Sequence, residues 1–73
     1  MVVYLQSKIK GAFEGWNPHT IYELKNGTKW MLSGHKHSSK SLNSPKAEIL
    51  RDGDDYYLKV ARIEKPEKVH RVE

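Results

Sequence analysis

The dipeptide Asn26-Gly27 constrains the fold of this chain more than any other feature of its sequence. Segments in which apolar and polar residues alternate lie on both sides of it. An Asn-Gly pair in this setting is the strongest short-range signal for a two-residue β-hairpin turn, in which both central residues need a positive φ. The alternation places Tyr22 and Leu24 on one face, and Trp30 lies on the same face in the segment after the turn. The sequence therefore predicts an antiparallel β protein.

The same alternation recurs along the chain and predicts five to six short strands that share one core. The first strand is expected over residues 2–14, and a second hairpin is expected at Asp52-Gly53. Ile63 falls out of step with the segment before it, which indicates a β-bulge near Arg62. The side chains expected to fill the core are Ile9, Phe13, Tyr22, Leu24, Trp30, Leu32, Ala47, Ile49, Tyr56, Leu58 and Val60.

The size of the chain limits it to one small domain. It has 73 residues and no cysteine, so neither a disulfide nor a thiolate metal site can supplement its core. Short strands at this spacing, without helical periodicity, favour a small all-β barrel over residues 1–73, because a barrel removes exposed sheet edges. An SH3-like barrel of five to six antiparallel strands is the preferred interpretation. An OB-like barrel is the alternative, although OB folds usually carry a helix.

The stretch 33–45 does not follow the alternation. It is rich in serine, lysine and histidine, and Leu42 is its single large apolar residue. This composition is typical of a flexible loop. A loop of this length is unusual in so small a domain. Two alternatives therefore stay open, a mobile loop or a long extended strand that presents a row of polar side chains.

Four features of the chain occur in a fixed order, namely Trp16, the hairpin Thr20–Trp30, Pro45 and the segment Gly53–Val60. Together they resemble a family of small uncharacterised bacterial domains with an SH3-like barrel, over most of residues 7–72. In that family, tyrosines alternate with small residues between the second tryptophan and the proline, whereas this chain has histidine, serine and asparagine there. The resemblance implies the SH3-like fold and a bacterial source, and it brings no established activity.

Enzyme chemistry is not expected from this sequence. No serine lies in a Gly-x-Ser-x-Gly setting, and the aspartates beside Gly53 lie in a turn, where aspartate is favoured for its local hydrogen bonds. His35 and His37 would point the same way on a strand, but a stable metal site needs further ligands that the spacing does not indicate. No catalytic residue, no metal and no cofactor are therefore predicted.

The charge of the chain suggests one candidate function. The net charge is +4, and the stretch Lys25–Lys46 holds five lysines without any acidic residue. Lysines gathered on one surface attract phosphates, and the absence of arginine from this stretch argues against base recognition. Weak, sequence-nonspecific nucleic-acid binding is therefore the alternative function. The candidate residues are Lys29, Lys36, Lys40 and Lys46.

A non-enzymatic module that binds a protein partner, or a second copy of itself, is the preferred function. SH3-like barrels bind partners through exposed aromatic side chains or by strand addition at an open edge. Trp16 lies in a loop and Tyr57 alternates out of phase with the core, so these two residues are the predicted partner contacts. No membrane contact is expected, because no apolar run approaches the roughly 20 residues that span a bilayer. The cytoplasm is the expected location.

Overall fold

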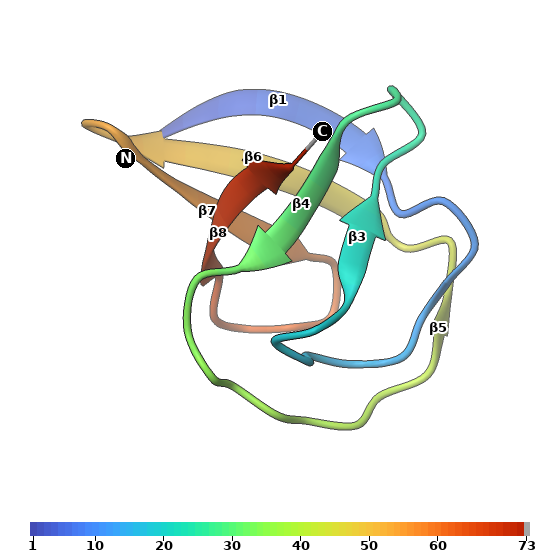
Figure 1. Ribbon diagram of the computed structural model, residues 1–73. Coiled ribbons are helices and arrows are strands. Elements are labelled where there is room, and N and C mark those ends of the chain that lie inside the picture. The colour runs from blue at the N-terminus through green and yellow to red at the C-terminus, as the bar shows by residue number, and fades with distance from the viewer. Residues whose placement is uncertain (73) are drawn as a thin grey trace.

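The computed structural model describes residues 1–72 and shows an all-β chain, as the alternation predicts (Figure 1). Within those residues, β1, β6, β7, β8, β4 and β3 form, in that order, one antiparallel sheet, while β2 and β5 form a small second sheet. The predicted domain ends at Glu73, which lies outside the described residues. The strands are β1 (Val2–Lys8), β2 (Ala12–Phe13), β3 (Ile21–Glu23), β4 (Lys29–Leu32), β5 (Leu42–Asn43), β6 (Lys46–Asp52), β7 (Asp55–Val60) and β8 (Glu67–Val72).

The two end strands of the six-stranded sheet, β1 and β3, also contact each other. One antiparallel β-bridge joins Ile9, just after β1, to Leu24, just after β3. The amide of Lys25 donates a hydrogen bond to the carbonyl of Lys8 at 2.8 Å beside this bridge. Both bridged side chains are buried. The sheet thus curls around one core until its ends meet at this point, whereas the SH3-like barrel type stays a prediction.

The alternation identified the core correctly with one exception. Every expected core residue is buried except Tyr56, which is half-buried and packs against the others. Trp16 and Val69 join the core without having been expected there. Apolar burial of this kind is the main favourable term in folding, at about 25 cal/mol per Å² removed from water. The core comprises Ile9, Phe13, Trp16, Tyr22, Leu24, Trp30, Leu32, Ala47, Ile49, Leu58, Val60 and Val69.

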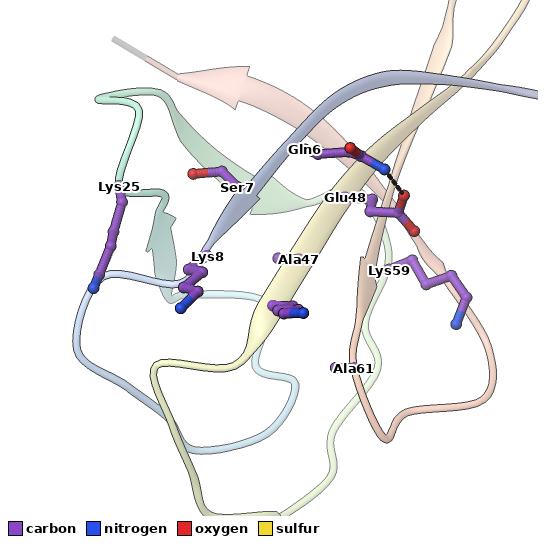
Figure 2. A pocket seen from close by; sticks show the side chains of 9 residues that line it. Gln6, Ser7, Lys8, Lys25, Ala47, Glu48, Lys59 and Ala61 are labelled. Atoms are coloured by element: carbon purple, nitrogen blue, oxygen red, sulfur yellow. Dashed lines mark hydrogen bonds between the residues drawn. The ribbon is translucent and has the colours of Figure 1, made fainter.

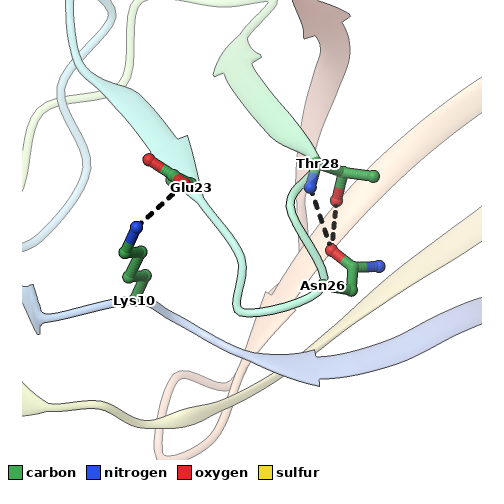
Figure 3. A network of polar contacts seen from close by, with 4 residues as sticks. All are labelled: Lys10, Glu23, Asn26 and Thr28. Atoms are coloured by element: carbon green, nitrogen blue, oxygen red, sulfur yellow. Dashed lines mark hydrogen bonds and ion pairs between the residues drawn. The ribbon is translucent and has the colours of Figure 1, made fainter.

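The Asn26-Gly27 hairpin is confirmed, but its turn is not the predicted one. The carbonyl of Leu24 accepts from the amide of Gly27, and the amide of Leu24 donates to the carbonyl of Thr28, both at 2.9 Å. Gly27 has φ +92°, whereas Asn26 does not have a positive φ. This pattern is a type I turn followed by a left-handed glycine. The Oδ1 of Asn26 accepts from the amide and the hydroxyl of Thr28, which holds the loop (Figure 3).

The first strand was predicted too long. Strand β1 ends at Lys8, and β2 begins at Ala12 after a break at Gly11, whose φ is +81°. The carbonyl of Gly11 accepts from the amide of Ser44 at 2.9 Å. Glycine adopts such a φ without steric cost, so the chain turns out of the main sheet here and enters the small one.

The predicted bulge near Arg62 is a turn. Strand β7 ends at Val60, the amide of Ile63 donates to the carbonyl of Val60 at 3.0 Å, and Arg62 has φ +70°. A left-handed residue in a turn explains why Ile63 leaves the alternation, so the bulge prediction was wrong. The hairpin at Asp52-Gly53 is confirmed, with Gly53 at φ +63° as the first residue of the two-residue turn between β6 and β7.

Trp16 was predicted to be a partner contact, and the structure contradicts this. Its side chain is 3% exposed, and its ring packs edge-on against Phe13 and Tyr22, with centroids 5.2 and 5.6 Å apart. The Tyr22 hydroxyl donates to the carbonyl of Gly15 and accepts from the amide of Asn17, both at 2.8 Å. The loop that precedes β3 is therefore held over the core by an aromatic cluster and by one buried hydroxyl.

Replacing Trp16 with alanine is expected to destabilise the domain by about 3–5 kcal/mol, the usual effect of removing a buried tryptophan. Such a loss is a large part of the free energy of unfolding, which is roughly 4–11 kcal/mol for a chain of this size. Urea unfolding followed by circular dichroism measures it, with Tyr57→Ala as the control for a half-buried aromatic residue. Equal midpoints for the two variants would contradict the burial of Trp16.

Replacing Tyr22 with phenylalanine is expected to cost about 1–3 kcal/mol, because the Gly15 carbonyl loses its buried donor. Burial raises the pKa of the Tyr22 hydroxyl above its ordinary value of 10.0, an effect that its hydrogen bond with Asn17 opposes. The unfolded chain therefore releases this proton first, and the stability linked to it is complete below pH 10 and is lost as the pH rises through the raised pKa.

Thermal unfolding between pH 8 and pH 11.5 tests this linkage. The alkaline loss of stability should be smaller in Tyr22→Phe than in the parent chain. Identical alkaline slopes in the two proteins would show that the Tyr22 hydroxyl does not titrate differently on folding.

Candidate functional site

Strand β1 presents an open sheet edge. Residues 2–7 pair with β6 on one side, and within residues 1–72 no other strand pairs with them. Val2 is 66% exposed and Val3 50%, and the strand carries no charged side chain before Lys8. Natural proteins usually protect such edges with charges, proline or a covering segment. We call the unpaired side of residues 2–7 the β1 edge.

An apolar row lies on the outer face of the sheet beside the β1 edge. Val3 is paired with Leu50 of β6, and Leu50 is paired with Tyr57 of β7. Residues directly opposite one another share a face of the sheet, and Ile49 and Leu58, which alternate with this row, are fully buried. The row Val3–Leu50–Tyr57, called the outer row below, therefore points away from the core. Tyr57 lies outside the core, as predicted.

Tyr4 has a different environment from its neighbours. The register of β1 with β6 shifts between Val3 and Leu5, so Tyr4 has no paired residue in β6. Bulges of this kind re-aim a side chain. The ring of Tyr4 packs edge-on against Tyr56 with centroids 5.1 Å apart, and Tyr56 in turn lies 5.5 Å from Trp30. The exposed end of β1 is thereby anchored to the core through two tyrosines.

A groove of about 630 Å³ occupies the other end of the same outer face, across β1, β6 and the end of β7 (Figure 2). Ala61 lines it together with Ala47, whose side chain belongs to the core, and four lysines surround them. The groove is lined by Gln6, Ser7, Lys8, Lys25, Lys46, Ala47, Glu48, Lys59 and Ala61. We call it the four-lysine groove, after Lys8, Lys25, Lys46 and Lys59.

Strand register brings these lysines together. Lys8 is directly opposite Lys46, and the amide of Lys25 is bonded to the carbonyl of Lys8. Lys59 is opposite Glu48, but the Glu48 carboxylate accepts from the amide nitrogen of the Gln6 side chain at 2.9 Å (Figure 2). The charge pattern missed Lys8 and Lys59 because they are distant in sequence from the basic stretch. The pairing of β1 with β6 was the missing information.

The lysines of the groove have no acidic neighbour within ion-pair distance in the described part of the chain. The three ion pairs found there involve lysines elsewhere. They join Lys10 to Glu23, Lys36 to Glu67 and Lys68 to Asp55. Within the described residues, Glu48 is the single acidic residue that lines the groove, and it forms no ion pair with the four lysines.

The predicted nucleic-acid residues do not gather on one surface. Lys29 lies on β4, and Lys36 is 4.0 Å from the carboxylate of Glu67. Lys40 lies beside the small sheet, where its amide donates to the carbonyl of Glu14 at 3.3 Å. Of the four residues predicted, Lys46 alone lines the groove. The basic stretch is thus continuous in sequence but divided in space.

The polar stretch 33–45 is irregular over most of its length. It contains the two-residue strand β5, and its middle runs beside the loop that carries Trp16. The amide of Ser38 donates to the carbonyl of Trp16 at 3.1 Å, and the Trp16 amide donates to the Ser38 hydroxyl at 3.3 Å. Gly15 has φ +107°, and a Cβ there would lie 2.2 Å from the Ser38 carbonyl oxygen. Only glycine permits this approach.

Metal-ligand clusters and membrane-spanning helices were sought over residues 1–72. That range contains no group of three or more histidine, cysteine, aspartate or glutamate side chains able to hold a metal ion, and His35 and His37 acquire no further ligand from it. No helix in the same range is long and apolar enough to cross a membrane.

Comparisons of the chain with protein-family models, with curated proteins and with solved structures give no significant match. The function must therefore be argued from the geometry and charge of the surfaces described above.

Proposed function

We propose that the protein is a non-enzymatic binding module that takes up an extended segment of a partner protein along the β1 edge. The observation that carries this proposal is the unpaired, uncharged stretch of β1, with Val2 66% exposed. In strand addition, main-chain hydrogen bonds supply affinity, and contacts with alternate side chains supply specificity. The outer row supplies such a contact for one side chain of the incoming strand.

Three features support this function. Contiguous exposed apolar residues on a small domain mark an interaction surface more often than single exposed ones do, and Met1, Val2, Val3 and Tyr4 are contiguous. The packing of Tyr4 on Tyr56 holds the edge in an extended form before a partner arrives, which lowers the entropy cost of binding. Tyr57 remains a proposed contact with the partner protein. Val3 is proposed as the second contact in place of Trp16, which is buried.

The barrel type and the cellular compartment of the protein are inferred from its sequence. The domain is a small SH3-like barrel, because its residue pattern resembles that of a family with this fold. It works in the cytoplasm, because the chain has no cysteine, as is common in reducing compartments.

Val3→Lys is expected to weaken strand addition by about tenfold or more, equal to about 1.4 kcal/mol, because it places a charge on the apolar edge. Ile21→Lys is the matched control, since Ile21 is similarly exposed, at 54%, but lies on β3. Displayed ten-residue peptides are selected on the immobilised parent protein, and the affinity of the enriched peptides is measured for all three proteins by fluorescence anisotropy.

Enriched peptides should have alternating apolar residues and should bind the Ile21→Lys protein as well as the parent. Sedimentation velocity on the same proteins shows whether the edge instead takes a second copy, which would appear as a dimer that Val3→Lys abolishes. Equal affinity of the enriched peptides for the parent and for Val3→Lys, with no dimer, would refute strand addition at β1.

A further inference from the structure

We propose that the four-lysine groove binds the phosphates of single-stranded nucleic acid without sequence preference. This site differs from the basic stretch of the sequence, because Lys8 and Lys59 belong to it and Lys29, Lys36 and Lys40 do not. It shares only Gln6 and Ser7 with the β1 edge, since it lies on the sheet face at the Lys8 end of β1.

The first reason is the placement of like charges. Lys8 and Lys46 are directly opposite each other on paired strands, an arrangement that destabilises a sheet. Lys25 follows the bridge residue Leu24 and lines the same groove, so it adds a third positive charge close by. Among the described residues that line the groove, Glu48 supplies one carboxylate against four lysines. A bound phosphate would supply the missing negative charge.

The second reason is that, within residues 1–72, the acidic cluster of the chain lies far from the groove. The acidic residues of the β6–β7 hairpin begin at Asp52, at the far end of β6 from Lys46. Six residues of extended strand separate them by about 20 Å. The Debye length at physiological salt is about 8 Å, so charge at that distance is largely screened. The groove therefore keeps its positive potential.

The third reason is the chemistry of the groove surface. Ala61 gives the groove a small apolar surface, and the lysines form a charged rim around it. A single-stranded nucleic acid matches both parts, because it repeats a phosphate beside a flat, largely apolar base. Lysine offers a point charge and not the planar fork of arginine, so the rim attracts phosphates and does not read base edges. Binding is therefore sequence-nonspecific.

Fluorescence anisotropy with a labelled 15-residue oligo-dT, between 50 and 200 mM salt, tests the proposal. Four phosphate contacts predict a slope of log K against log salt of about −2.8 for a single strand. The variant Lys8→Gln/Lys25→Gln/Lys46→Gln leaves one groove lysine, so the slope should fall to about −0.7. Its affinity at 50 mM salt should fall by about tenfold or more.

The control variant is Lys29→Gln/Lys40→Gln/Lys65→Gln, which removes the same charge from lysines that form no ion pair within residues 1–72. It should keep the parent slope and an affinity within about threefold. Equal losses in the two variants would show that net charge, and not the groove, attracts the oligonucleotide, and would overturn the proposal. Circular dichroism of both variants confirms that the fold is retained.

Two further arms define the ligand class. Oligo-dA and oligo-dC of the same length should bind within about threefold of oligo-dT. Poly-glutamate, added at the same charge concentration, should compete poorly, and equal competition would assign the groove to an acidic protein segment and refute nucleic acid. The Val3→Lys protein should bind oligo-dT as the parent does, so this assay and the peptide assay can fail independently.

Discussion

The bridge between Ile9 and Leu24 is the contact on which the rest of the structure depends. Both side chains are buried, and the bridge joins the two end strands of the sheet across the core. Because successive side chains alternate in direction, the neighbours Lys8 and Lys25 turn outward at the same point. The burial of two apolar residues therefore also brings two lysines together. One contact thus accounts for the curl of the sheet and for one end of the groove.

The core could be predicted from the sequence because inward and outward positions alternate whatever the order in which strands pair. The burial of Trp16 could not be predicted in this way, because it lies in a loop without alternation. Its ring is buried against Phe13 and Tyr22. The position of the hairpin at Gly27 was predictable for a similar local reason. Its turn type was not, because Asn26 can satisfy the Thr28 amide without a positive φ.

The surfaces proposed to bind were less predictable than the core. The outward direction of Tyr57 could be predicted from its phase in the strand, which is local information. The grouping of Lys8 with Lys46 depends on strand register, because about half of the chain separates the two residues. The open edge of β1 likewise depends on which strands do not pair with it. Local patterns therefore gave the direction of each side chain, whereas the surfaces came from long-range pairing.

The contact between Gly15 and Ser38 has a consequence for how this protein can vary. The path of the polar segment is set there mainly by main-chain amides and carbonyls, with the Ser38 hydroxyl and one glycine that leaves room for them. Every residue type except proline supplies those main-chain groups. The exposed side chains of this segment, such as His35 and His37, can therefore be exchanged with little effect on folding. Substitutions there can change the chemistry of the surface while the cluster of Phe13, Trp16 and Tyr22 stays covered.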